Sequence, residues 1–193
     1  MNVYLDLETI PDQTPNAVEV IMEEIEVKAP SLTKPKLIEL LKLDASSAKY
    51  KSVDELKDIW LERHGEEAKK EQAIEKWLKT SFDGGKGEIC CIGYACHNMK
   101  SGYQITGTEK EILEEFNNHM ADRLGSRIDG SLKEVYFICH NAKFDLPFLH
   151  KRFVVNGIKP QFKCNFNGRH GQHHFCTMEE WAGFNGRISQ DNL

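Results

Sequence analysis

Residues 134–157 read EVYFICHNAKFDLPFLHKRFVVNG, and this stretch carries the pattern from which the fold class is inferred. Its first part, residues 134–139, is an apolar run that predicts a buried strand. After His140 the apolar side chains recur at helical spacing, and Asn156 and Gly157 form a typical helix end. A buried strand that leads directly into an apolar helix is typical of an α/β protein.

Segments earlier in the chain predict further elements of the same sheet. Residues 3–7 form an apolar run that predicts the first strand, which Pro11 ends. Residues 87–95 predict a central strand, and residues 103–106 predict its hairpin partner. Thr108, with a glutamate three residues later, predicts a capping box at the start of a helix that crosses back over the sheet. Together these elements predict an α/β domain with a mixed β-sheet flanked by helices.

The composition is that of a globular protein. The chain has 193 residues, of which 40% are hydrophobic and 28% charged, and its net charge is −5. This charge argues against a basic surface that binds nucleic acid indiscriminately, but it does not exclude a nucleic-acid enzyme whose carboxylates hold divalent metals. Six cysteines without a signal sequence predict reduced thiols, and no apolar run is long enough to cross a bilayer. We therefore expect a cytoplasmic protein that does not bind membranes.

The segment after the first strand differs in character from the rest of the chain. Residues 12–86 are rich in Glu and Lys and carry apolar residues at helical spacing, which predicts three or four amphipathic helices. One of these begins after Ser52 as N-cap, and a further one covers residues 66–79. Acidic residues interrupt the lysines, so a basic face that follows a nucleic-acid strand is doubtful. A solvated face and a surface for a protein partner both remain open.

Three carboxylates form the candidate chemical centre. Asp6 and Glu8 stand at positions i and i+2 of the first strand and therefore point to the same side. Asp145 lies just inside the helix that follows a second apolar strand. Three carboxylates in one cleft repel one another strongly unless cations are bound, and carboxylate oxygens are the ligands that hard divalent cations prefer. The pattern predicts a metal site.

Two motifs resemble those of the DnaQ-like, or DEDD, superfamily of 3′–5′ exonucleases. The matching residues are Asp6, Glu8 and Thr9 in the first motif and His140, Asn141, Phe144 and Asp145 in the second. They occur in the family's order, and the resemblance covers about residues 1–11 and 87–157. It implies a ribonuclease H-like fold with a helical insertion after the first strand, that is, a single domain over residues 1–193 with a core of 1–11 and 87–193 and an insertion of 12–86.

The resemblance also implies an activity, which is metal-dependent 3′–5′ exonuclease action by two-metal phosphodiester hydrolysis with Mg²⁺ or Mn²⁺. It assigns catalysis and metal binding to Asp6, Glu8 and Asp145, and substrate binding to Thr9, Asn141 and Phe144. For Phe144, ordinary packing in the helix core is an equal alternative. The expected partner is nucleic acid, with single-stranded DNA 3′ ends favoured over RNA. Compact exonucleases with large insertions are common in phage and prophage genomes, so the resemblance also implies a phage-encoded protein that acts in the host cytoplasm.

The family's third motif, Tyr-x-x-x-Asp or His-x-x-x-x-Asp, has no match in this sequence. Asp191 lacks a Tyr or His at either spacing, and His174 with Glu179 is a weak substitute. Residues 187–193 resemble the start of the family's next helix, with Ser189 as N-cap, so we expect the core to be C-terminally incomplete. We therefore expect low activity from these 193 residues. The alternative is a catalytically impaired exonuclease fold that binds nucleic acid or a protein.

A rival metal site lies between residue 157 and Thr177, where the sequence predicts a loop followed by a short helix. Zinc prefers cysteine and histidine ligands, and this segment contains Cys164, His170, His173, His174 and Cys176. Their spacing matches no common zinc motif. A structural Zn²⁺ at Cys164, His170, His173 and Cys176 is therefore not favoured, and a polar loop near the substrate cleft is the preferred interpretation.

Overall fold

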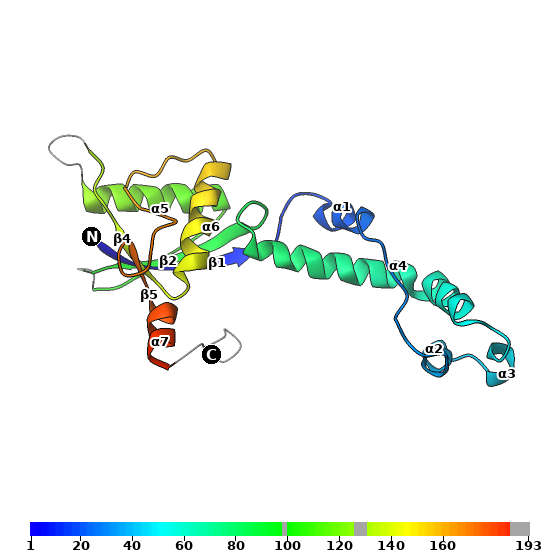
Figure 1. Ribbon diagram of the computed structural model, residues 1–193. Coiled ribbons are helices and arrows are strands. Elements are labelled where there is room, and N and C mark those ends of the chain that lie inside the picture. The colour runs from blue at the N-terminus through cyan, green and yellow to red at the C-terminus, as the bar shows by residue number, and fades with distance from the viewer. Residues whose placement is uncertain (98–99, 126–130, 186–193) are drawn as a thin grey trace. The chain divides into compact units, whose positions relative to one another are not determined.

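The computed structural model describes residues 1–97, 100–125 and 131–185, and it divides the chain into two compact units (Figure 1). The first, called the sheet unit, comprises Met1–Gln13 and Lys79–Leu193. The second, called the helical unit, comprises Thr14–Leu78. The helical unit thus follows the first strand of the sheet unit in the sequence.

The sheet unit contains a mixed sheet of five strands in the order β3-β2-β1-β4-β5. The strands are β1 (Asn2–Ile10), β2 (Glu88–Cys96), β3 (Tyr103–Thr106), β4 (Tyr136–Cys139) and β5 (His174–Cys176). β2 runs antiparallel to both β1 and β3, whereas β4 runs parallel to both β1 and β5. The predicted α/β class with a mixed sheet and flanking helices is confirmed.

The two faces of β1 differ in burial because successive side chains of a strand point to opposite sides. The buried side chains are Val3, Leu5 and Leu7, and the exposed ones between and beside them are Tyr4, Asp6 and Glu8. Helices α5 (Glu109–Leu124) and α6 (Ala142–Val155) cover the buried face (Figure 1). Phe116 of α5 and Phe153 of α6 are fully buried in this core. The acidic residues of β1 are therefore left on the opposite face.

Local sequence signals explain where several elements begin. The capping box at Thr108 is confirmed, since the Thr108 backbone N–H donates to Glu111 Oε2 at 3.0 Å at the start of α5. The helix predicted after Thr177 is present as α7 (Thr177–Asn185). The first strand, predicted from the apolar run at residues 3–7, extends to Ile10 and ends directly before Pro11, as predicted, so Asp6 lies within the strand.

Residues 158–176 do not form the continuous loop that we predicted. β5 occupies the last three of these positions and pairs in parallel with β4, with Phe137 opposite His174 and Cys139 opposite Cys176. A three-residue strand is too short to show an alternating pattern of hydrophobicity, and its pairing with β4 is a tertiary contact. The prediction missed it for that reason.

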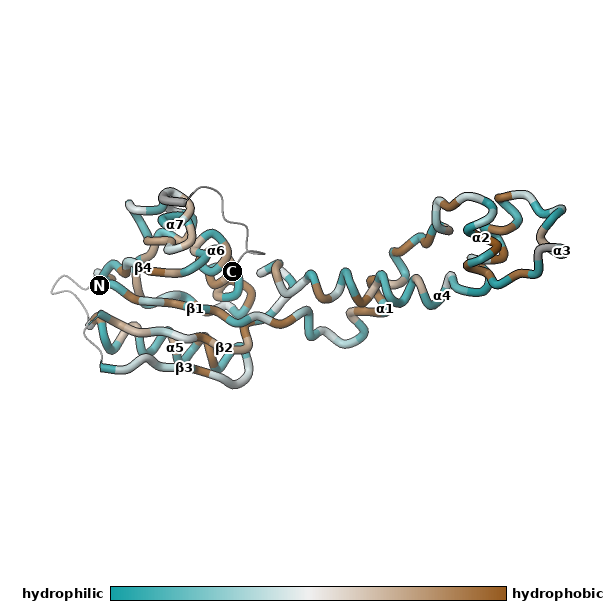
Figure 2. The backbone as a smooth tube through the Cα atoms, turned by 90° about the horizontal axis from the view of Figure 1, so that it is seen from below, coloured by the Kyte–Doolittle hydropathy of each residue, from teal (hydrophilic) through white to brown (hydrophobic). Residues whose placement is uncertain are grey.

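The helical unit consists of α1 (Ala17–Glu23), α2 (Lys34–Leu40), α3 (Ala45–Ala48) and α4 (Val53–Lys79), whose last residue falls in the sheet unit. Its small core contains Leu37, Leu41 and Leu56, with Trp60 packed against them. Along α4 the backbone tube alternates between hydrophobic and hydrophilic colours (Figure 2), as in a helix with one apolar face. No catalytic signature accompanies these elements.

α4 is one helix of 27 residues, so the separate helix predicted over residues 66–79 was wrong. Gly65 lies inside it in open surroundings, where an added Cβ atom would meet no neighbouring atom within 4 Å, and a glycine inside a helix costs only about 1 kcal/mol relative to alanine. The Ser52 N-cap is confirmed, because the Glu55 backbone N–H donates to Ser52 Oγ at 3.1 Å. Of the helices in the described ranges, none combines the length and apolar character that a membrane span requires.

Candidate functional site

Asp6 and Glu8 project from the face of β1 that α5 and α6 leave uncovered. Asp6 pairs with Gly93 of β2, and Glu8 pairs with Cys91. Between Glu8 and Thr9 the register shifts by one residue, which is a β-bulge, and Cys90 Sγ lies 3.4 Å from the Glu8 carbonyl oxygen. Bulges re-aim side chains and often occur beside active sites. The sequence contained no signal for this one.

Asp145 lies in the first turn of α6 and is only 4% exposed. Its backbone N–H donates to the Asn141 carbonyl oxygen at 3.0 Å, which holds the turn in place. Burial, and then the neighbouring Asp6 and Glu8 carboxylates, raise the pKa of Asp145 from 3.8 to about 7. The structure therefore brings together the three carboxylates that the sequence singled out.

The surroundings of Asp145 fit a divalent cation in donor chemistry. A buried carboxylate beside two others is destabilised in its charged form, and a cation would reverse that effect. Oxygen donors of this kind suit Mg²⁺ and Mn²⁺. Among the residues that the structure describes, no group of three or more His, Cys, Asp or Glu side chains is arranged to hold a metal ion. What favours a cation here is the burial of Asp145 and the negative charge around it.

The predicted substrate-binding residues lie near the C-terminal end of β1 and at the N-terminal end of α6. Thr9 directly follows Glu8 and is half-buried. Asn141 precedes α6, and within the described structure its side chain makes no capping hydrogen bond. Phe144 is half-buried, and its ring centroid lies 5.2 Å from that of Phe148. Phe144 thus packs against the core and remains partly exposed.

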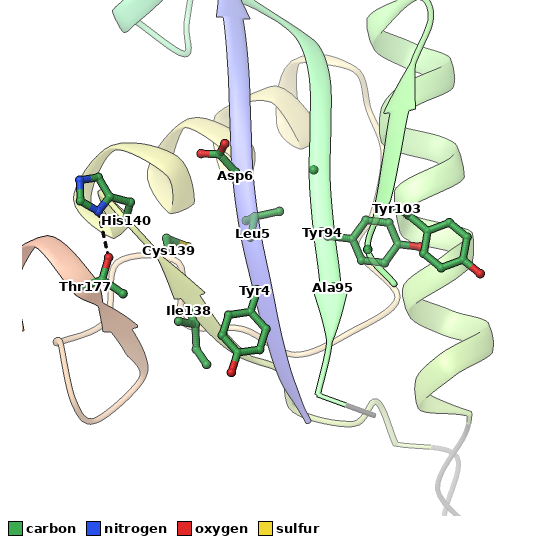
Figure 3. A pocket seen from close by; sticks show the side chains of 12 residues that line it. Tyr4, Leu5, Asp6, Tyr94, Ala95, Tyr103, Ile138, Cys139, His140 and Thr177 are labelled. Carbon is green, nitrogen blue, oxygen red and sulfur yellow. Dashed lines mark hydrogen bonds between the residues drawn. The ribbon is translucent and has the colours of Figure 1, made fainter. Parts of the chain in front are cut away.

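A pocket of about 480 Å³ opens on the uncovered face of the sheet beside Asp6 (Figure 3). Tyr4 projects from β1 two residues before Asp6, and Ile138 of β4 lies beside it. His140 and Thr177 line the pocket too, with His140 Nδ1 2.9 Å from Thr177 Oγ1. Sequence reasoning assigned no role to Tyr4, although its spacing from Asp6 already placed both on one face of a strand.

The residues of the rejected zinc site make local hydrogen bonds. His170 Nδ1 accepts from the Cys176 backbone N–H at 3.0 Å, and His173 Nδ1 accepts from the Arg169 backbone N–H at 3.0 Å. Burial, followed by the charge of Glu134, raises the pKa of the Cys164 thiol to about 12. These contacts are those of a packed polar segment.

His174 and Glu179, the weak substitute for a third motif, lie in different settings. His174 is 3% exposed, and within the described residues neither ring nitrogen has a hydrogen-bond partner. Glu179 Oε1 lies 2.6 Å from Lys143 Nζ, and this contact lowers the pKa of Glu179. Because Glu179 is paired with a lysine, it is poorly suited to act as a fourth metal-binding carboxylate. Asp191 and Ser189 lie outside the described residues.

We expect His174 to make the protein less stable in mild acid. Burial lowers the pKa of His174 below its usual 6.5, so the unfolded chain binds a proton more readily than the folded one. The unfolding free energy should therefore fall as pH drops below 6.5. The charged and titratable groups that act on His174 are Glu179, His170, His173 and Lys143. Urea denaturation at successive pH values should show a shallower decline for His174→Met than for the wild type, and equal slopes would contradict this prediction.

Comparisons of the chain with protein-family models, with curated proteins and with solved structures found no match.

Proposed function

We propose that this protein is a metal-dependent 3′–5′ exonuclease with a ribonuclease H-like core, acting on single-stranded DNA ends. One observation carries the proposal: Asp145 is a buried carboxyl group whose pKa is raised by burial and by the Asp6 and Glu8 carboxylates. The strand order β3-β2-β1-β4-β5, with β2 antiparallel to its neighbours, is compatible with that core.

The three neighbouring carboxylates lower the free energy of unfolding unless a cation is bound to them. The Asp145 carboxylate is buried and lies near the exposed Asp6 and Glu8 carboxylates, so its charged form destabilises the folded chain at neutral pH, and such arrangements are typical of functional sites. In the proposed enzyme, Asp6, Glu8 and Asp145 would hold Mg²⁺ or Mn²⁺. Bound there, the cations would polarise the scissile phosphate and activate water as the nucleophile.

The chain's own residues would bind and orient the nucleic acid. Thr9 and Asn141 are proposed to contact the terminal nucleotide, and Phe144 to pack against its base. The nucleic-acid strand is proposed to lie along the pocket beside Asp6, because the exposed ring of Tyr4 lines this pocket. Aromatic side chains near a backbone-binding site stack on bases of any sequence. Turnover is expected to be slow, because in the described part of the chain no Tyr or His with a correctly spaced Asp joins the three carboxylates.

A degradation assay on a 5′-labelled single-stranded oligonucleotide in Mn²⁺ tests the proposal. We expect slow shortening from the 3′ end by the wild type and none by Asp6→Ala, because Asp6 supplies a metal-binding oxygen on the open face of β1. Glu19→Ala removes an exposed carboxylate in the helical unit and should retain wild-type shortening. An RNA strand of the same sequence, run in parallel, compares the two substrate classes.

Two outcomes would contradict the proposal. If Asp6→Ala shortened the strand as fast as the wild type, the activity would not arise from this site. If the wild type bound the oligonucleotide but released no product in Mn²⁺, the chain would be a binding module and not an exonuclease.

A further inference from the structure

Phe82 is a large aromatic side chain that is 71% exposed, and nothing in the sequence assigned it a role. It ends a short 3₁₀ helix, η1 (Thr80–Phe82), in the sheet unit. Its ring centroid lies 6.1 Å from that of Phe144, with the ring planes inclined at 63°. Phe144 immediately precedes Asp145. The exposed ring of Phe82 therefore lies beside the helical turn that carries the buried carboxyl group.

The backbone that carries Phe82 is held between the end of β1 and α6. On the β1 side, the Asp12 backbone N–H donates to Thr80 Oγ1 at 2.8 Å. A Cβ atom at Gly87 would lie 2.5 Å from the Thr80 carbonyl oxygen and 2.9 Å from that of Ile10, so only glycine permits this close approach.

On the α6 side, the loop after Phe82 packs directly on the helix. Arg152 Nη1 donates to the Gly84 carbonyl oxygen at 3.3 Å, and a Cβ atom at Gly84 would lie 3.2 Å from Phe148 Cα. Phe82 is thus exposed although its loop is fixed on both sides. Held on a rigid scaffold, Phe82 forms an aromatic pair with the half-buried Phe144, an arrangement suited to binding a planar ligand.

The charges around Phe82 suit a polyanion. Lys86 and Lys151 are exposed, and both lower the pKa of Asp83, after its hydrogen bond from the Gly85 backbone N–H and the bond from Lys151 itself. Lys151 forms an ion pair with Asp83, the residue that follows Phe82, with Nζ 3.4 Å from Oδ1, and Lys86 stands three residues after Asp83. Proteins bind single-stranded nucleic acid with exposed aromatic rings that stack on bases and with nearby cations that follow the phosphates.

We propose that Phe82, together with the half-buried Phe144, forms a platform on which a base near the 3′ end of a single strand stacks. The inference rests on the proposed function, because the carboxylates define where that 3′ end lies. Phe82 is then a substrate-binding residue. It increases the affinity of the protein for the single strand and does not change the rate of the chemical step.

Kinetics on two matched oligonucleotides tests the platform. The first is a 5′-fluorescein-labelled oligothymidylate, and the second is the same strand with abasic nucleotides at its 3′ end. In Mn²⁺ we expect Phe82→Ala to raise KM for the oligothymidylate by about tenfold and to leave kcat within about twofold of the wild type. KM for the abasic strand should not change, because it offers no base to stack. Phe82→Trp should restore the wild-type KM.

The control is Tyr50→Ala, which removes an 86% exposed aromatic ring from the helical unit and should leave both KM values unchanged. Thermal melts of each variant check folding. Equal effects of Phe82→Ala on the two strands, or no effect on either, would overturn the inference. If the wild type shows no Asp6-dependent turnover, the proposed function fails, and the binding of the same two strands, measured by fluorescence anisotropy, then tests Phe82. If Phe82→Ala no longer prefers the oligothymidylate over the abasic strand, the platform is supported. If the preference is unchanged, the platform is refuted.

Discussion

Replacing Asp145 with Asn should stabilise the metal-free protein by up to about 4 kcal/mol at a pH of about 8, and it should abolish the proposed exonuclease activity. Burial and the Asp6 and Glu8 carboxylates raise the pKa of Asp145 from 3.8 to about 7. A raised pKa means that the folded chain keeps this proton longer than the unfolded chain does. The contribution of Asp145 to the unfolding free energy is therefore fully present below pH 3.8 and is lost as pH rises through about 7. Asn is neutral and similar in shape, so this loss disappears in the variant.

The measurement is urea denaturation in EDTA at several pH values for the wild type and Asp145→Asn. The difference in unfolding free energy between the two proteins should widen between pH 4 and about pH 8, because only the wild type has the ionising Asp145 carboxyl group, whose charge lowers stability over that range. Asp122→Asn, at an exposed position of α5, is the matched control and should give no such gap. Adding Mn²⁺ should stabilise the wild type and leave Asp145→Asn unchanged. A gap that does not depend on pH would refute the electrostatic explanation.

Arg152→Met should lower the unfolding free energy by about 3 to 5 kcal/mol, since it leaves a buried carboxylate without its cation. Arg152 binds Glu109 in a bidentate manner, with Nε 2.7 Å from Oε1 and Nη2 2.6 Å from Oε2, and both side chains are 6% exposed. Glu109 Oε1 also accepts from the Ile89 backbone N–H at 2.7 Å. The pair therefore joins α5, α6 and the start of β2.

A second variant separates the charge from the packing. Glu109→Gln in the Arg152→Met background keeps an acceptor for the Ile89 N–H but removes the unpaired charge, so the double variant should be more stable than Arg152→Met alone. Lys110→Ala breaks an exposed pair with Glu114, in which the nitrogen and oxygen are 3.8 Å apart, and should change stability little. Chemical denaturation of the three variants is the measurement. A double variant as unstable as the single one would show that the lost packing dominates.

The elements that could be predicted are those that local chemistry determines. The capping box at Thr108 depends on residues three apart, and the N-cap at Ser52 likewise. The alternation along β1 assigns Asp6 and Glu8 to one face of the strand wherever the strand lies. A helix that starts after a buried strand places Asp145 in its first turn. These signals are local, so they are legible in one sequence.

The elements that escaped prediction depend on contacts between distant residues. β5 is a strand only because β4 lies beside it, and the continuity of α4 through Gly65 was not evident from its pattern. The bulge next to Glu8 arises from the pairing of β1 with β2. Phe82 could not be singled out, because its exposure and its contact with Phe144 exist only once η1 is packed between β1 and α6.

The sequence alone determined the fold class and the identity of the three carboxylates, since side-chain alternation and helix-start signals act over a few residues. The tertiary structure decided how strongly those carboxylates affect one another. The pKa of Asp145 depends on its burial and on Asp6 and Glu8, which are far from it in the chain and near it in space. Desolvation and Coulomb interaction vary with distance and environment, and neither is encoded in the spacing of residues along the sequence.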